Sequence, residues 1–126
     1  MQIDVLDLLG VRYKKNGRDE NGLDCFGLVI EVSKRFGHEL PDFEYLKTNW
    51  EVFNENKEKI AKECKLKKVT SPCEGDLLLF KVCCAFENHI GVYLGDDQFI
   101  HCDKYGVHIQ SLSDYSSELG SVYRWY

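Results

Sequence analysis

The stretch GLDCFGLVIEV, at residues 22–32, decides the fold. From Cys25 to Phe36 the apolar side chains recur at helical spacing, which predicts an amphipathic helix. Asp24 stands at the mouth of this helix, and Gly37 supplies its C-terminal stop. One face of the helix is apolar and must be buried against another element. That face consists of Cys25, Leu28, Val29, Val32 and Phe36.

From Gly75 onward the chain has the pattern of β-strands. The β-rich runs, separated by Gly, Asp and Asn turns, are Leu77–Val82, His89–Leu94, Gln98–Cys102, Val107–Leu112 and Val122–Trp125. Because the connections are short, we expect an antiparallel meander. The predicted fold class is therefore α+β, with N-terminal helices and the helix from Cys25 packed on a curled antiparallel sheet.

Two more helices and a loop are predicted in the N-terminal half. Ile3–Leu9 has the spacing of a short helix ended by Gly10, and Lys14–Gly22 is a polar loop with two glycines. A third helix is predicted to begin at Thr48, because Thr48 and Glu51 form a capping box. Its apolar stripe consists of Trp50, Phe53, Ile60 and Cys64.

Composition limits the classes of protein to which the chain can belong. Its 126 residues fit one domain over 1–126, and a hydrophobic content of 44% argues against disorder. The net charge of −5 disfavours a nucleic-acid partner. The N-terminal MQIDVLDLLG carries acids where a secretion signal carries lysines, and no apolar run reaches the length of a membrane span. We therefore expect synthesis in the cytoplasm without a signal peptide, and no membrane partner.

The six cysteines are expected to be reduced. Cys83 and Cys84 are adjacent, and no Cys-x-x-Cys pair occurs. A zinc-binding module is an alternative, with ligands from Cys102 and His101 or from the adjacent pair. It ranks last because the usual ligand spacing is absent, so no metal is expected.

Cys25 and His89 are the candidates for nucleophile and general base. Free amide groups and the positive end of the helix dipole at Cys25 are expected to lower the pKa of its thiol, and the same amides can stabilise an oxyanion. His89 begins the second predicted strand. Each residue also has a structural interpretation, since free cysteines are often simply buried and a histidine at a strand end can be a surface residue.

His101 follows His89 by twelve residues, on the next predicted strand. A three-residue loop at Gly95–Asp97 pairs Gly91 with His101 and puts both histidines on one face of the sheet. A two-residue Asp96–Asp97 turn with regular pairing puts them on opposite faces. A triad with His101 therefore requires an odd-length loop or a bulge; otherwise His101 is a core residue.

Four other residues have locations or roles that the sequence does not decide. Cys102 is expected in the core on the face opposite His101, and His108 is expected to be exposed on an ordinary strand. His38, after Gly37, has the position of a residue that caps helix carbonyls. Tyr13 belongs either to the core or to the candidate active site, to which it would contribute its hydroxyl group.

Together these features resemble the NlpC-type family of papain-like cysteine endopeptidases, which cut peptidoglycan stem peptides. The resemblance spans nearly the whole chain. It is carried by GVRYKKNG at 10–17, GLDCFGLVIEV at 22–32, GDLLLFKV at 75–82, NHIGVYLGDDQFIHC at 88–102 and GVHIQSL at 106–112. It implies a papain-like fold, a single catalytic domain and no cofactor.

The resemblance also implies roles for individual residues. Cys25 corresponds to the nucleophile, His89 to the base and His101 to the group that orients the base. Tyr13 corresponds to the tyrosine that supports the oxyanion site, and Asp24 to the acid before the cysteine. The bond implied is the one from γ-D-glutamate to a diamino acid.

One departure concerns the residue after the nucleophile. Phe26 stands where many members have serine. An aromatic there, followed by GLVIEV and then by LPDFEY at Leu40–Tyr45, is similar to the subgroup associated with phage and prophage tails. That subgroup implies other tail proteins as partners and action at the cell wall within a larger particle. Two alternatives remain: an amidase or acyltransferase on the same scaffold, and a non-catalytic tail-assembly subunit.

Overall fold

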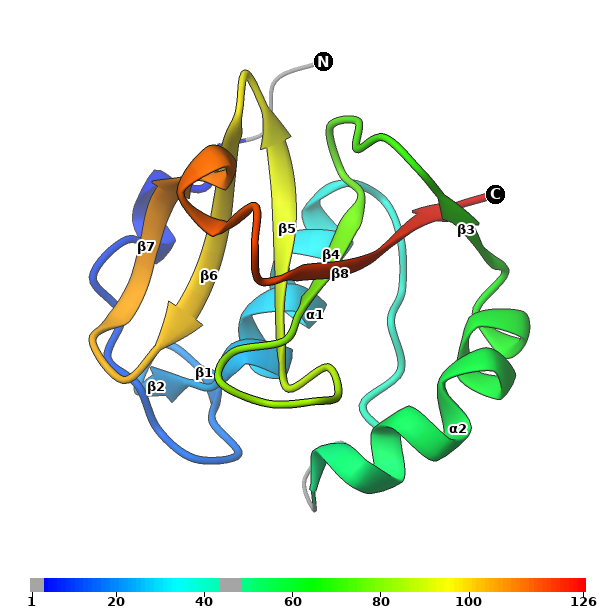
Figure 1. Cartoon of the computed structure of the whole chain (residues 1–126). Helices are drawn as coiled ribbons and strands as arrows, with labels where there is room; N and C mark the ends of the chain where they lie inside the picture. Colours follow the sequence, from blue (N-terminus) through cyan, green and yellow to red (C-terminus); the bar gives the residue numbers. More distant parts are fainter. Residues whose placement is uncertain (1–3, 44–48) are drawn as a thin grey trace.

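A six-stranded antiparallel sheet organises the structure, a computed structural model that describes residues 4–43 and 49–126. Its strands are β3 (Leu66–Val69), β4 (Leu77–Phe80), β5 (His89–Gly95), β6 (Gln98–Asp103), β7 (Gly106–Ser111) and β8 (Leu119–Trp125). Their spatial order is β3-β8-β4-β5-β6-β7. With the two helices α1 and α2 on the sheet (Figure 1), the predicted α+β class is confirmed.

The predicted meander holds for β4 to β7 and is wrong for the last strand. β8 pairs with β4 and lies between β4 and β3, instead of continuing beyond β7. After β7 a short 3-10 helix, η3 (Leu112–Tyr115), intervenes and the chain returns to the open edge of β4. An open edge presents unpaired N–H and C=O groups, and β8 satisfies them. β3, which was not predicted as a strand, then pairs with β8.

The N-terminal segment contains less helix and more strand than predicted. Within the described part of Ile3–Leu9 the chain forms only a 3-10 turn, η1 (Leu6–Leu8); Ile3 lies outside the described residues. The Gly10 amide bonds the Val107 carbonyl at 3.0 Å, which pulls the chain out of a helical path. The loop predicted at Lys14–Gly22 contains a small hairpin of β1 (Arg18–Asp19) and β2 (Gly22–Leu23).

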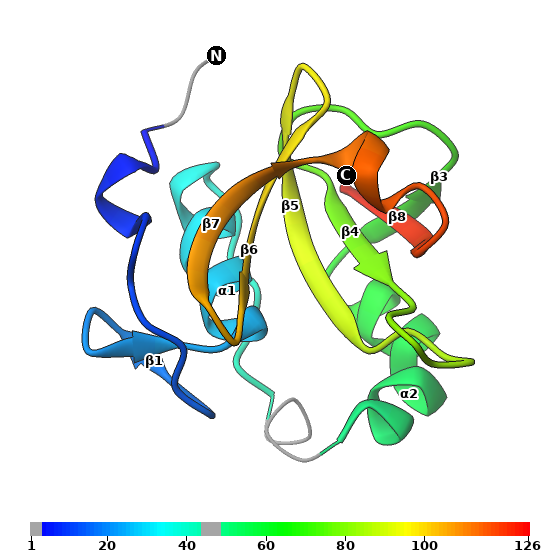
Figure 2. The ribbon, with the colours of Figure 1, turned by 60° about the vertical axis from the view of Figure 1, so that its left-hand side comes forward.

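Helix α1 (Cys25–Arg35) agrees with the predicted helix to within one residue at its end. It packs against β5 and β6, and the side chains of Leu28, Val29 and Val32 are fully buried there. Figure 2 shows α1 lying against the curved sheet. The apolar face identified in the sequence is thus the face that contacts the sheet.

Helix α2 (Trp50–Glu63) begins later than predicted. Its N-cap is Asn49, whose side chain accepts a hydrogen bond from the Val52 amide at 2.9 Å; Thr48 lies outside the described residues. Asparagine caps a helix at least as well as threonine, so the capping box one residue earlier does not decide the start.

Phe26 joins the two helices. Its buried ring stacks on Trp50 with centroids 4.7 Å apart, and it contacts Phe53 at 5.4 Å. The aromatic residue that departs from the family pattern therefore has a packing role, because it seats the first turn of α2 against the first turn of α1.

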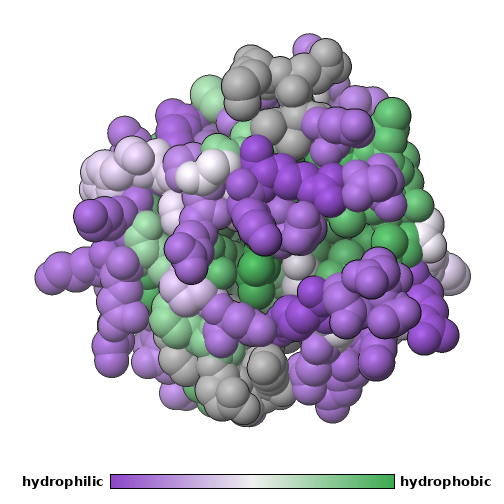
Figure 3. All heavy atoms as spheres, turned by 180° about the vertical axis from the view of Figure 1, so that it is seen from behind, coloured by the Kyte–Doolittle hydropathy of each residue, from purple (hydrophilic) through white to green (hydrophobic). Residues whose placement is uncertain are grey.

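The sheet buries side chains on both faces. Ile90, Val92, Ile100 and Cys102 belong to the main core with α1, as expected for Cys102. A second cluster is built from Leu78, Phe80, Phe99, Leu112 and Val122. Seen from behind (Figure 3), the surface is largely hydrophilic, with hydrophobic surface gathered on one side and in a central hollow. Within the described ranges, every helix is too short or too polar to cross a membrane.

Candidate active site

Cys25 is the first residue of α1, and Asp24 is its N-cap. One oxygen of Asp24 accepts the Gly27 amide at 2.8 Å and the Arg18 guanidinium at 2.6 Å. The other oxygen accepts the Asn16 amide at 3.1 Å. Asp24 therefore fixes the start of the helix and the preceding hairpin, and through them the position of Cys25.

The expected lowering of the Cys25 pKa is wrong for the resting site. Burial, and then the negative charge of Asp24, raise the pKa of Cys25 to about 12. The amides of Ile90 and Phe26 act in the opposite direction, but they do not outweigh the loss of water. The side chain of Cys25 is consequently a neutral thiol at neutral pH.

A bulge decides the relation between His89 and His101. The turn is the two-residue Asp96–Asp97 type, with both residues at positive φ (51° and 63°), and it pairs Gly95 with Gln98. Regular pairing from there would put His101 on the face opposite His89. The register shifts between Tyr93 and Gly95, however, so that Gly91 pairs with His101. The two imidazoles therefore share one face of the sheet.

The two histidines are hydrogen-bonded to each other. His89 Nε2 lies 2.7 Å from His101 Nδ1, and His101 is almost completely buried. Burial, and then the proximity of His101, lower the pKa of His89 to about 4. Burial also lowers the pKa of His101, although its hydrogen bond to Gln110 opposes this. Both rings are thus neutral at neutral pH.

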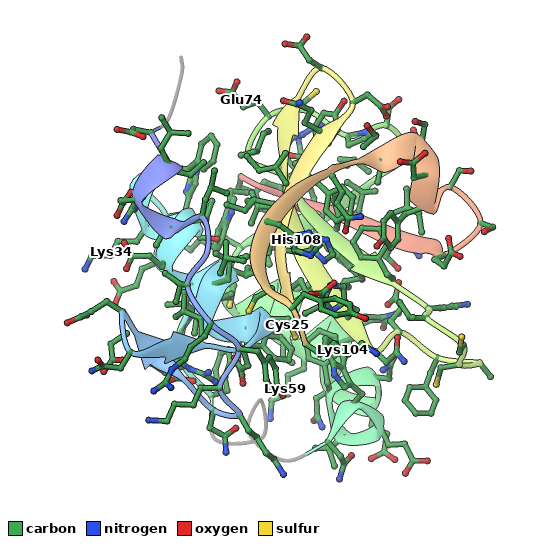
Figure 4. All side chains as sticks on the ribbon, turned by 90° about the vertical axis from the view of Figure 1, so that its left-hand side faces the viewer. Cys25, Lys34, Lys59, Glu74, Lys104 and His108 are labelled. Carbon is green, nitrogen blue, oxygen red and sulfur yellow. The ribbon has the colours of Figure 1, made fainter. Side chains whose placement is uncertain are left out.

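An open cleft of about 570 Å³ brings four of the five predicted site residues together: Tyr13, Asp24, Cys25 and His89 line it. Figure 4 shows Cys25 at the start of α1, with Lys104 of the β6–β7 turn on the same side of the molecule, and Lys104 also lines the cleft. The fifth residue, His101, lies behind His89 and reaches the cleft through it.

Tyr13 is the exposed member of this group. Burial, and then the negative charge of Asp24, raise the pKa of its phenol. The hydroxyl therefore stays protonated and can donate a hydrogen bond in the cleft that Tyr13 and Cys25 both line.

The structure adds residues that sequence reasoning did not place at the site. Trp50 lines the cleft, although its spacing indicated only an apolar stripe. His108 is half-buried rather than exposed, and its ring stacks on His101 with centroids 4.5 Å apart. Gln110 bonds His101 Nε2 at 2.6 Å. A two-residue turn at Lys104–Tyr105 pairs His101 with His108. This turn is the feature of the sequence that could have predicted the position of His108 beside His101.

The ligand atoms of His101, Asp103 and His108 lie within 4.8 Å of one another. Both ring nitrogens of His101 already have hydrogen-bond partners, so a metal ion here would have to displace His89 or Gln110. Cys102, the ligand considered from the sequence, points to the other face, and its thiol donates to the Leu23 carbonyl at 3.1 Å. The arrangement thus favours hydrogen bonding over metal binding.

His38 lies away from this site. Its amide bonds the Ser33 carbonyl at 2.9 Å, and its ring stacks on Trp125 at 4.8 Å. The backbone of His38 thus contributes to ending α1, close to the capping role considered from the sequence.

Comparison with known proteins gives relatives over most of the chain. Murein DD-endopeptidase MepS/Murein LD-carboxypeptidase of Escherichia coli (strain K12) is 31% identical over 110 residues, which are 86% of this chain and 51% of the relative. The probable endopeptidase NlpC homolog of Haemophilus influenzae is 35% identical over 108 residues, 84% of this chain and 50% of the relative. The chain thus spans about half the length of these two relatives.

Solved structures share the fold. The NlpC/p60 domain of peptidoglycan hydrolase SagA superposes with a TM-score of 0.62 at 19% identity, covering 94% of this chain and 91% of that one. NlpC2 from Trichomonas vaginalis gives a TM-score of 0.68 at 20% identity, covering 97% and 44%. The family model described as NlpC/P60 family matches residues 10–121. With this match and the shared fold, the chain belongs to the NlpC/P60 family.

Proposed function

We propose that this chain is a cysteine endopeptidase that hydrolyses peptidoglycan stem peptides, and that residues 1–126 act as one catalytic domain. The observation that carries the proposal is the cleft in which the thiol at the start of α1 faces the same space as an imidazole supported by a second imidazole. The names of the E. coli and H. influenzae relatives, both endopeptidases, support the same reaction class.

In the first step Cys25 attacks the carbonyl carbon of a stem-peptide amide. Because the resting thiol and imidazole are both neutral, the thiol proton passes to His89 as the S–C bond forms. The amide at the first turn of α1 and the hydroxyl of Tyr13 stabilise the oxyanion. His89, now an imidazolium, gives the proton to the departing amine as the C–N bond breaks, which leaves a thioester on Cys25.

In the second step water hydrolyses the thioester. Neutral His89 accepts a proton from the attacking water, and the protonated ring then returns it to the departing thiolate of Cys25. His101 holds the other nitrogen of His89 through both steps, the part that a third triad member has in this chemistry. Every group needed for these steps is a side chain or amide of the chain itself, so the proposal calls for no cofactor.

The proposed bond is the one between γ-D-glutamate and the diamino acid, as the family resemblance implies. The test is mass spectrometry of soluble muropeptides incubated with the wild type, with Cys25→Ala, and with Cys73→Ala as the matched control, since Cys73 is an exposed thiol. We expect fragments split after γ-D-glutamate with the wild type and the control only.

Other products would change the proposal in defined ways. Release of whole stem peptides from the glycan would make the enzyme an amidase, and a new amide or ester on the peptide would make it an acyltransferase. Absence of any cleavage by folded wild-type protein would reject the endopeptidase proposal for the isolated chain and favour a structural subunit.

We further propose that the protein acts at the cell wall, as part of a phage-tail-like particle. The support for the particle is the resemblance carried by Phe26, by GLVIEV after it and by LPDFEY at 40–45, of which residues 44 and 45 lie outside the described ranges. The ring of Phe26 seats α2 beside the cleft. Co-purification of the chain with tail proteins from an induced lysogen tests this. Recovery of the chain only as a free protein would contradict it.

A further inference from the structure

His101 is hydrogen-bonded at both ring nitrogens. Nδ1 lies 2.7 Å from His89 Nε2, and Nε2 lies 2.6 Å from the carboxamide oxygen of Gln110 on β7. The same oxygen accepts a hydrogen bond from the Tyr115 hydroxyl at 2.9 Å. Tyr115, Gln110, His101 and His89 thus form one continuous chain of hydrogen bonds that ends at the cleft.

The direction of each bond in this chain follows from the oxygen of Gln110. A carboxamide oxygen only accepts, so His101 must carry its proton on Nε2. A neutral imidazole has one ring proton, which leaves Nδ1 of His101 as an acceptor. His89 must then carry its own proton on Nε2, and its Nδ1 is left as a free lone pair.

We propose that Gln110 is a positioning residue that sets the tautomers of His101 and His89, so that His89 Nδ1 is the base that receives the Cys25 proton. The inference rests on the proposed function for its catalytic consequence. With the Gln110 carboxamide reversed, each proton in the chain would move to the other nitrogen, and His89 would present N–H to the thiol instead of a lone pair.

The other groups around His101 do not contact its nitrogens in this way. His108 stacks on the face of the ring, and its Nε2 lies 3.0 Å from an oxygen of Asp103. Phe99 also contacts the ring, with centroids 4.6 Å apart. Within the ranges that the structure describes, Gln110 is therefore the one hydrogen-bond partner of His101 Nε2.

A neutral acceptor suits this role better than a carboxylate. The hydrogen bond that His101 donates to Gln110 raises the pKa of His101, but burial has the larger effect and keeps the ring neutral. A carboxylate at this position would favour the imidazolium form of His101. That form carries a proton on Nδ1 as well, and His89 Nε2 could then no longer donate to it.

The test measures the tautomers directly. Protein labelled with ¹⁵N-histidine is compared by long-range ¹H–¹⁵N correlation at mildly alkaline pH as wild type, Gln110→Leu and Gln98→Leu. Gln98→Leu is the matched control, because Gln98 is exposed at the far end of β6. We expect the Nε2–H form for His89 and His101 in the wild type and the control, and a mixture of forms in Gln110→Leu.

Kinetics on a muropeptide give the second readout. Gln110→Leu should lower kcat by roughly 10-fold or more with little change in KM. This loss should be smaller than the loss of about 10⁴-fold in kcat that follows when a triad is held in the wrong tautomer. Gln110→Glu should be active only at higher pH, where His101 loses its extra proton. The acidic limb of its pH–rate profile should therefore shift to higher pH than in the wild type. The titratable groups facing His101 in that profile are His89, Asp103, His108 and Tyr115.

Two results would overturn the inference: an Nδ1–H form of His89 in the wild type, or tautomers and kcat left unchanged by Gln110→Leu. Because the first is a measurement on the wild type, it stands even where a variant does not fold. If the wild type cleaves no muropeptide, the proposed function fails, while the tautomers still decide the part of Gln110.

Discussion

Mild acid should destabilise this fold, because it would have to protonate two neutral imidazoles: the half-buried ring of His89, which lines the cleft, and the buried ring of His101 behind it. His89 has a pKa of about 4 in the folded chain, against an ordinary value of 6.5. A histidine with a lowered pKa takes up its proton in the unfolded chain first. Its contribution to stability is therefore present above pH 6.5 and is lost as the pH falls towards 4.

The magnitude follows from the same two values. Between about pH 7 and about pH 5, His89 alone should lower the free energy of unfolding by about 2 kcal/mol. The lowered pKa of His101 acts in the same direction. The carboxylates contribute little in this range, because an unfolded aspartate or glutamate takes up most of its proton only at lower pH.

Urea unfolding of the wild type and of His89→Gln at these two pH values, followed by circular dichroism, measures the effect. The variant lacks the titrating ring, so its loss of stability between the two pH values should be smaller than that of the wild type by about 2 kcal/mol. Equal losses, or a wild type as stable in acid as at neutral pH, would refute the reasoning. The folded site would then hold a protonated His89, and an ion pair would replace the neutral pair in the proposed first step.

Three further outcomes are expected. Phe26→Ala should lower the free energy of unfolding by about 3–5 kcal/mol, since a buried ring that seats α2 is lost; urea unfolding should show a smaller loss for Phe26→Leu. Lys57→Met should lower the free energy of unfolding by about 3–5 kcal/mol, because it leaves the carboxylate of Glu87 buried without its partner. A change near zero in the same assay would mean that water reaches Glu87. At neutral pH iodoacetamide should alkylate Cys25 more slowly than the exposed Cys83, as peptide mapping can show, because the raised pKa leaves little thiolate; faster labelling of Cys25 would contradict the neutral resting thiol.

Helix α2 illustrates how much of the architecture is readable from local pattern. Its apolar stripe predicts its existence, and Phe53 and Ile60 are indeed its buried residues. Its contacts with the segment before His89, however, join parts of the chain that are far apart in the sequence. Asn54 donates to the Glu87 carbonyl at 2.7 Å, and Lys57 forms an ion pair with the Glu87 carboxylate. The helix therefore holds the segment just before His89 through contacts between residues 30 and 33 positions apart, which no sequence periodicity predicts.

The hairpin of β5 and β6 was predictable from the sequence in part only. Its strands follow from β-propensity, while the sequence left the turn open between a three-residue Gly95–Asp97 loop and the two-residue Asp96–Asp97 turn that the structure shows. The sequence left open whether His101 would face His89, because a bulge of one residue reverses the answer. The structure places the bulge between Tyr93 and Gly95, where no single residue type had marked it.

The sequence by itself determined the α+β class, the helix that begins at Cys25 and four of the strands in their order, because these depend on periodicity, caps and turns within a few residues. It also pointed to Tyr13, Asp24, Cys25, His89 and His101 as candidates. Only the tertiary structure decided the place of β8, the bulge that puts the two histidines on one face, and the hydrogen bond from His101 to Gln110. The pKa of Cys25 belongs to this second group as well. The helix start that should lower it is local, whereas the burial that raises it is summed over every element packed around the thiol.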